Sequence, residues 1–300
     1  MKLFNLNTLN FLARLLLVLI WVVSPNAVWS FSDEPVHHQL KIELEPLTRF
    51  ARIEDTIQFK TSSENCGSFY LHAGLNLERI PQGWQVKPSV RPGLNEIELV
   101  KSGSAACPKT LTLKYSGILH DPTLDPEESM DSSGFFFSGE SYFYPQIKRL
   151  LSRVTFDMQV SIPESWQAVS QGRRRELSGA ERIVTWKSYH PSEEIYLIGN
   201  RFHNYEVDHN GLTLYAFLLK EEEGLASEYL ETAKRYIDFY SRLIGPYPYE
   251  KFALIENSRQ TGYGMASFTL MGSSIIRFPF ILNSSYPHEI LHNWWGNGVF

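Results

Sequence analysis

Hydrophobic and polar residues alternate from about residue 36 to residue 219 with the period of two that is typical of β-strands. The clearest segment runs from Val154 to Ile162 and is ended by Pro163. Residues 40–44 and 111–115 repeat the same pattern. Such alternation indicates strands with one face on a core and the other in water. Because turn-forming Gly and Pro residues separate these segments, we expect an antiparallel β-sandwich or saddle.

The period changes near residue 224 to the helical spacing of hydrophobic residues. It predicts a helix over residues 224–244, ended by Gly245 and Pro246. Further on, the pattern predicts strands over 252–255 and 267–271. A second helix is expected to begin around Pro287, because proline is well tolerated in the first turn of a helix.

These elements together predict an α+β chain with more than one domain. We expect an N-terminal β-rich sandwich or saddle domain over residues 31–208 and a mixed α/β domain over residues 209–300. The sequence contains no evident internal repeat.

The first thirty residues have the pattern of a signal peptide. Lys2 and Arg14 are their only charged residues, and an apolar run follows over residues 15–23. A membrane-spanning helix needs about 20 apolar residues, so this run is short for an anchor and suits a signal peptide at residues 1–30. The alternative is an uncleaved N-terminal anchor. In either case the rest of the chain is expected outside the cytoplasm, in the periplasm, in the extracellular space or tethered to a membrane.

The composition is that of a globular protein. The chain has 300 residues, of which 43% are hydrophobic and 20% charged. The net charge of −5 gives no broadly basic surface, so we expect no nucleic-acid partner. Cys66 and Cys107 are the only cysteines. Because an exported protein meets an oxidising compartment, a disulfide between them is favoured over two free thiols.

The sequence with the most chemical information is His288-Glu289-Ile290-Leu291-His292, an H-E-x-x-H pattern. On a helix, residues four apart lie on one face, so both imidazoles can reach a single cation. A glutamate next to the first histidine can accept a proton from a water that the cation activates. The pattern therefore predicts a zinc site with a general base. The competing interpretation is a helix with two partly exposed histidines and a salt-bridging glutamate.

The residues around this pattern extend it. Trp294, Gly296 and Asn297 complete H-E-x-x-H-x-W-x-G-N, which resembles the signature of the aminopeptidase N family of gluzincin zinc metallopeptidases. Upstream, residues 263–267 occupy the place of the family's G-x-M-E-N motif. The resemblance covers residues 224–300 well and residues 35–300 loosely.

This resemblance implies a thermolysin-like catalytic domain after the β-saddle, and hydrolysis of a peptide substrate. It implies one zinc ion per chain, held by His288 and His292, with Glu289 as the general base. It also implies that the strand through Gly264 and Met265 binds the substrate backbone.

Two positions of the substrate motif depart from the family pattern. Ala266 stands where the family has a glutamate that grips the free α-amine of the substrate, and Ser267 replaces the asparagine that follows. Glu140, from the β-rich domain, is a second candidate for contact with this amine. We expect peptide hydrolysis to be retained while recognition of a free N-terminus is weakened or rebuilt.

The third zinc ligand of the family is also missing from the sequence. The resemblance places it, a glutamate, about 19 residues after His292 and so beyond Phe300. We therefore expect a fragment of a longer enzyme or an inactive product. Glu256 is another acid that could complete the site, although no spacing supports it. The alternative function is that of a catalytically inactive relative that acts as a binding or scaffold module.

Overall fold

The computed structural model describes residues 35–59, 68–100, 108–120, 130–147, 153–177, 182–258 and 262–298. The predicted signal segment at 1–30 and both Cys66 and Cys107 lie outside these ranges, so export and the disulfide stay predictions. Within these ranges, no helix has the length and apolar character needed to cross a membrane.

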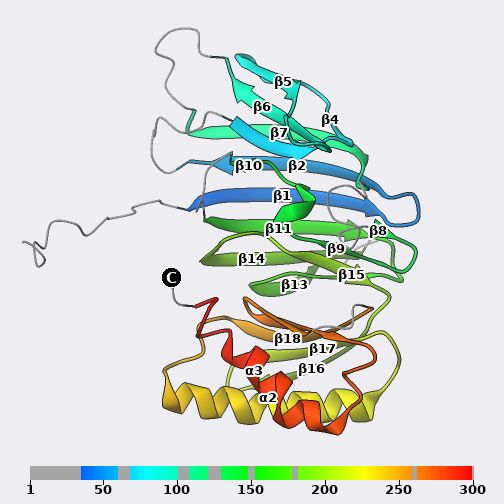
Figure 1. Cartoon of the computed structure of the whole chain (residues 1–300), viewed down its shortest axis with the longest axis vertical. Helices are drawn as coiled ribbons and strands as arrows, with labels where there is room; N and C mark the ends of the chain where they lie inside the picture. Colours follow the sequence, from blue (N-terminus) through cyan, green and yellow to red (C-terminus); the bar gives the residue numbers. More distant parts are fainter. Residues whose placement is uncertain are drawn as a thin grey trace, which may run out of the picture. The chain divides into compact units, whose positions relative to one another are not determined.

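The largest sheet has seven strands and confirms the alternating pattern. Its strands follow the order β13-β14-β11-β1-β2-β7-β4 (Figure 1). All neighbours are antiparallel except β1 and β11, which pair in parallel. The bounds are β1 Val36–Glu45, β2 Phe50–Gln58, β4 Leu75–Leu77, β7 Thr110–Ile118, β11 Val154–Ile162, β13 Arg173–Leu177 and β14 Arg182–Ser192.

Two four-stranded sheets complete the β-rich region, in the orders β10-β3-β6-β5 and β12-β15-β9-β8. A single hydrophobic core joins residues of all three sheets, among them Ile53, Phe69 and Phe137. The bounds are β3 Ser68–His72, β5 Trp84–Pro88, β6 Leu94–Leu99, β8 Met130–Asp131, β9 Gly134–Phe137, η1 Gly139–Ser141, β10 Gln146–Ile147, β12 Gln167–Val169 and β15 Leu197–Asn200.

A five-stranded mixed sheet follows, in the order β16-β17-β18-β20-β19. Its three central strands are parallel, and the two edge strands are antiparallel to their neighbours. The bounds are β16 His203–His209, β17 Leu212–Leu218, β18 Lys251–Asn257, β19 Gly262–Met265 and β20 Phe268–Gly272. The predicted domain boundary between residues 208 and 209 falls in β16. Since residues Glu34–Phe300 form one compact unit by their contacts, the division into two domains stays a prediction.

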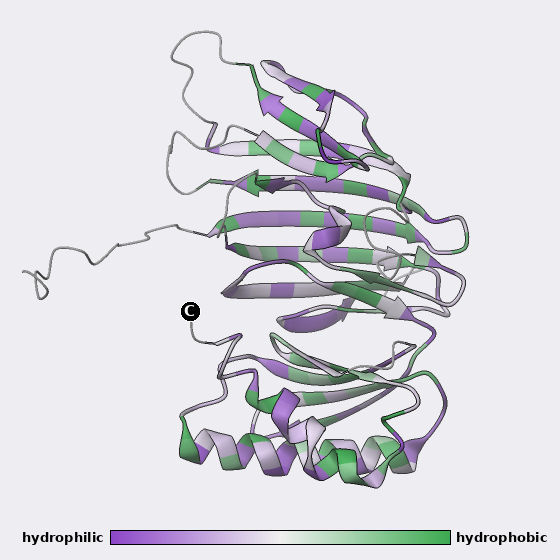
Figure 2. Cartoon of the chain, viewed as in Figure 1, coloured by the Kyte–Doolittle hydropathy of each residue, from purple (hydrophilic) through white to green (hydrophobic). Residues whose placement is uncertain are grey.

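Both faces of this sheet are buried, and they belong to different cores. On β17, Tyr215 and Phe217 join the core of the β-rich region, while Leu214, Ala216 and Leu218 join a second core. Burial on both faces explains the continuous apolar sequence of these central strands, which is visible in Figure 2.

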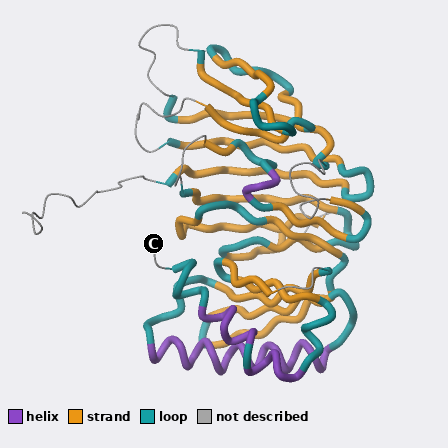
Figure 3. The backbone as a smooth tube through the Cα atoms, in the orientation of Figure 1, coloured by secondary structure: helices purple, strands orange, loops and turns teal. Residues whose placement is uncertain are grey.

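Helices cover the second core (Figure 3). Helix α2, Glu223–Leu243, begins one residue before its predicted start and packs its apolar face on the sheet. The short elements η2, Pro279–Asn283, and α3, Ser285–Leu291, complete this layer. The fold is therefore α+β, with a β-rich region followed by a mixed sheet with helices on one face.

Candidate metal and peptide site

Helix α3 presents the two histidines because its apolar residues face the second core. Tyr286 and Ile290 are fully buried there. His288 is exposed and His292 is half-buried. Their ring centroids lie 4.8 Å apart, as expected for residues four apart on one helix face. The structure thus brings the two predicted zinc ligands together.

The hydrogen bonding of His292 suits metal ligation. Its Nδ1 lies 3.1 Å from the carbonyl oxygen of Trp295. Because a carbonyl oxygen only accepts, Nδ1 must carry the proton, which leaves Nε2 with a free lone pair. Metal-ligating histidines usually have their second nitrogen fixed in this way.

Glu289 lies on the same helix and is only 8% exposed. A Cβ atom added at Gly262 would lie 3.3 Å from its Oε1, so glycine keeps the space beside this carboxylate open. A carboxylate next to two histidines matches the donor set of a zinc site with a general base. The fit is partial, however, because the described ranges hold no cluster of three His, Cys, Asp or Glu residues that could bind a metal.

Glu256 does not supply the third ligand, because both of its carboxylate oxygens are engaged elsewhere. Its Oε1 accepts a hydrogen bond from Arg277 Nη1 at 2.7 Å, and its Oε2 accepts one from the Leu219 N–H at 2.8 Å. The side chain is also 1% exposed. The suggestion that Glu256 completes the metal site is therefore wrong.

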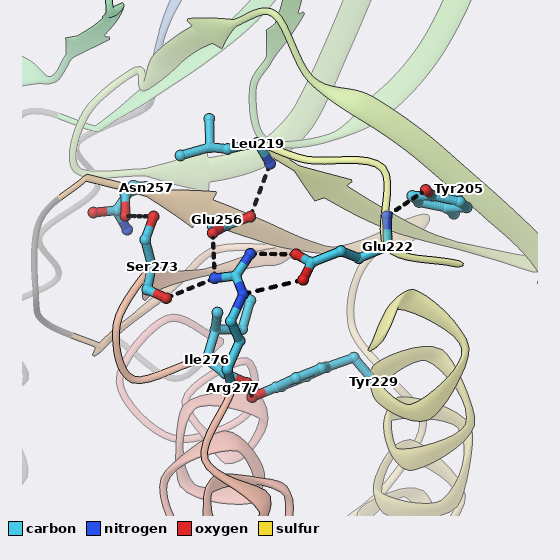
Figure 4. A network of polar contacts seen from close by, with 9 residues as sticks. All are labelled: Tyr205, Leu219, Glu222, Tyr229, Glu256, Asn257, Ser273, Ile276 and Arg277. Carbon is cyan, nitrogen blue, oxygen red and sulfur yellow. Dashed lines mark hydrogen bonds and ion pairs between the residues drawn. The ribbon is translucent and has the colours of Figure 1, made fainter. Parts of the chain in front are cut away.

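Figure 4 shows that Arg277 joins Glu256 to Glu222, at the start of α2. Arg277 also donates to the carbonyl oxygen of Ser273. The hydrogen bond from Arg277 holds the pKa of Glu222 below its usual range, and the two carboxylates raise the pKa of Arg277. This network fixes the segment between β20 and η2 against β18 and α2, and so positions the approach to α3.

Strand β19 runs directly beside α3. A Cβ atom at Gly264 would lie 2.7 Å from His292 Cβ and 2.8 Å from the Glu289 carbonyl oxygen, which is too close for any side chain. Asn297 Nδ2 donates to the Gly264 carbonyl oxygen at 2.9 Å. The glycine therefore allows the strand of the substrate motif to contact the backbone of the zinc motif.

The other predicted substrate residues have different surroundings. Met265 is partly buried and packs against the core of the β-rich region. Ala266 is buried in the turn after β19. Glu140 is exposed in η1, where its N–H donates to Ser138 Oγ. Substrate contact by these residues and by Gly264 stays a prediction.

A buried polar network beneath α3 was not predicted from the sequence. Lys251 Nζ donates to both the carbonyl oxygen and Oγ of Ser267, each at 2.9 Å. The Ser267 N–H donates to Asn293 Oδ1 at 2.9 Å, and Tyr247 OH donates to the same oxygen at 3.1 Å. Ser267 has a φ of 69°, in the left-handed region that non-glycine residues seldom occupy. The network therefore fixes a strained turn to the residue that follows His292.

The tandem tryptophans after the second histidine differ from each other. Trp294 is buried, and its Nε1 donates to the Gly245 carbonyl oxygen at 2.9 Å, so it anchors the end of α3. Trp295 is 70% exposed. Only the first of the two tryptophans therefore packs in the interior.

Comparison with known proteins shows a similarity in fold to solved structures. No protein-family model matches the sequence, and no curated protein matches it. Among solved structures, the chain is similar to the M1 zinc metallopeptidase from Deinococcus radiodurans and to a Glu-to-Ala mutant of that enzyme. The TM-score is 0.62 for both, with 16% identity to the enzyme and 15% to the mutant. The similarity covers 88% of this chain and 65% of each of those chains, and at this identity it concerns the fold.

Proposed function

We propose that this protein is a zinc-dependent peptidase. The observation that carries the proposal is the close contact of α3, with His288, Glu289 and His292, and β19, with Gly264. The similarity in fold to an M1 zinc metallopeptidase supports the same class of activity.

In this proposal His288 and His292 hold the metal through their ring nitrogens, with Nε2 as the donor on His292. Zinc, when bound, supplies a Lewis acid that polarises a peptide carbonyl and acidifies a water. In this proposal Glu289 would accept a proton from the attacking water on a carboxylate oxygen and pass it to the leaving nitrogen. Glu289 is only 8% exposed and lies on the same helix as the two histidines, which places its carboxylate beside them.

The proposed substrate is a peptide that lies along β19. As an edge strand, β19 can add a further extended chain by backbone hydrogen bonds. Ala266 offers no carboxylate for a free α-amine. We therefore propose that peptides with a blocked N-terminus are accepted nearly as well as free peptides.

Zinc binding is tested on the purified chain by competition with a chromophoric chelator. We expect His288→Ala and His292→Ala each to weaken zinc binding at least about tenfold, the lower effect of losing one metal ligand or its supporting group. Glu289→Gln is the matched variant, because it keeps both histidines and should retain zinc. Equal zinc affinity in all four proteins would refute the metal site.

Activity is tested on the protein expressed from its complete reading frame, with matched free and N-acetylated peptides. Glu289→Gln should lower kcat by about a hundredfold or more, the usual contribution of a general base. A large preference for the free amine would contradict the proposal for the substrate. Zinc binding without any hydrolysis would favour the inactive binding module, for which Ala266 is the supporting observation.

We also propose that the protein acts outside the cytoplasm, supported by the apolar run over residues 15–23. Mass spectrometry of the protein from its native host should find a mature N-terminus near residue 31. An intact N-terminus on protein recovered from the cytoplasm would contradict this.

A further inference from the structure

A cavity of about 560 Å³ is lined in part by Tyr247 and Lys251, two members of the polar network beneath α3. It is bounded by the edge strand β13, the turn between β16 and β17, the C-terminal half of α2 and the segment before β18. Its lining includes Arg174, Asp238, Tyr247, Tyr249, Glu250 and Lys251.

The walls of this cavity carry more positive than negative charge. Arg173, Arg174, Arg175 and Lys251 are cationic side chains, whereas Asp238 and Glu250 are the acids among the lining residues. Asp238 is already paired, since its Oδ1 lies 2.8 Å from His209 Nε2. The net charge of the walls therefore favours an anion.

Arg174 is the most buried of the three arginines. Its side chain is only 7% exposed, and its guanidinium lies over the rings of Tyr215 and Phe217, at 5.5 and 5.8 Å from their centroids. One nitrogen, Nη2, donates to Glu176. Its Nε is buried and has no hydrogen-bond partner within the described residues. A buried N–H without an acceptor is costly, and a ligand oxygen would satisfy it.

Lys251 is a second buried basic side chain on the same cavity. It is 1% exposed, and its hydrogen bonds go to the neutral oxygens of Ser267. No carboxylate pairs with it in the part of the chain that the structure describes. Burial, and then the nearby charge of Arg174, lower its pKa well below the usual value. Among the described residues, Arg174 has one carboxylate partner, Glu176, and Lys251 has none, so an anion in the cavity would supply the missing counter-charge.

We propose that this cavity binds the oxyanion group, phosphate or carboxylate, of a small ligand through Arg174 and Lys251. The exposed Arg173 and Arg175 stand at its rim and would attract the ligand. Arginine suits this role because its fixed fork of N–H groups matches two oxygens of one oxyanion. The inference does not depend on the proposed peptidase activity and can succeed or fail separately.

A ligand in this cavity would also contact residues that hold the zinc motif in place. Tyr249 OH donates to the Asn297 carbonyl oxygen at 2.7 Å, and Tyr247 donates to Asn293. Lys251 holds Ser267, next to β19. We therefore expect oxyanion binding to slow hydrogen exchange of the backbone in residues 264–267 and 292–297.

The test is calorimetric titration of the purified chain with inorganic phosphate and, separately, with glutarate. Both titrations use an oxyanion-free buffer held at constant ionic strength with sodium chloride. We expect saturable binding at one site. Tighter binding of phosphate would identify a phosphate ligand, and tighter binding of glutarate a carboxylate ligand.

Arg174→Gln should raise the Kd of the preferred probe at least about tenfold, because a hydrogen bond to a charged group is lost. If that variant does not fold, Arg173→Gln and Arg175→Gln, made together, test the rim instead, and they should raise the Kd by a smaller factor while the Arg52→Gln control leaves it unchanged. Arg52→Gln is the matched control, since Arg52 is an exposed arginine paired with Glu43 on the seven-stranded sheet. No saturable binding of either probe, or equal Kd values in all variants, would overturn the proposal.

Discussion

Replacing Lys251 by methionine removes an ammonium group from a position that is 1% exposed. Methionine has a similar length and no charge, so it can keep the contacts with the rings of Trp186 and Phe268, over which Lys251 Nζ lies at 5.4 and 5.2 Å. The variant loses the two hydrogen bonds to Ser267. That loss is about 1–3 kcal/mol and does not vary with pH in the neutral to alkaline range.

The pH dependence of the unfolding free energy separates the effect of the buried ammonium group from that of the two lost hydrogen bonds. The folded state lowers the pKa of Lys251, whereas in the unfolded chain a lysine has a pKa of about 10.4. Between these two pKa values the unfolded chain binds one more proton than the folded chain. Unfolding free energy therefore rises with pH in this window by about 1.4 kcal/mol per pH unit, and this stability is lost as the pH falls.

The assay is urea unfolding of wild type and Lys251→Met at half-unit steps from pH 7 to pH 10, in a buffer without phosphate or carboxylates. The difference in unfolding free energy between the two proteins should change across the part of this range that lies above the folded pKa. Lys41→Met, at an exposed lysine of β1, is the control and should give a constant difference from wild type. A difference for Lys251→Met that stays flat over the whole range would refute the reasoning.

Three further substitutions test the contacts around α3. Gly264→Ala places a Cβ atom 2.7 Å from His292 Cβ, so we expect weaker zinc binding in the chelator assay, and unchanged affinity would contradict the strand contact. Asn293→Ala leaves the buried Ser267 N–H without its acceptor, whereas Tyr247 OH keeps the Lys251 carbonyl oxygen at 3.1 Å. The unfolding free energy in urea should fall by about 1–3 kcal/mol, and a loss under about 0.5 kcal/mol would refute this. Arg277→Met leaves the buried carboxylate of Glu256 unpaired and should cost about 3–5 kcal/mol at pH 7. Most of that loss should be recovered in the double variant with Glu256→Gln, and a purely additive double variant would argue against the pair.

Local patterns predicted the elements whose burial repeats along the chain. Strand β11 has the predicted bounds, Val154–Ile162, because one of its faces is buried and Pro163 ends it. Helix α2 was predicted to within a residue at its start, for the same reason at helical spacing. The parallel pairing of β1 with β11 was not predicted, since it joins segments more than a hundred residues apart and leaves no local signal.

In the candidate site too, some residues could be predicted from local sequence and others could not. His288, Glu289 and His292 are four residues apart or fewer, so helix geometry alone places them together. Lys251 gave no signal, because a lysine at the start of a strand is normally solvent-exposed. Its contact with Ser267 depends on how two strands meet under α3, which sequence spacing does not encode.

The five-stranded sheet lies between two hydrophobic cores and contributes side chains to both. This limits where the chain can be cut into separately folding fragments. A fragment that begins after residue 208 would expose Tyr215, Phe217 and Ile255 to water, because their packing partners lie in the β-rich region. A fragment that ends at residue 208 would expose the apolar residues of the β-rich region against which these three side chains pack. Exposed apolar strand faces of this kind promote aggregation. The two halves are therefore expected to melt in a single transition, so that damage to the β-rich region should also weaken zinc binding at the proposed metal site.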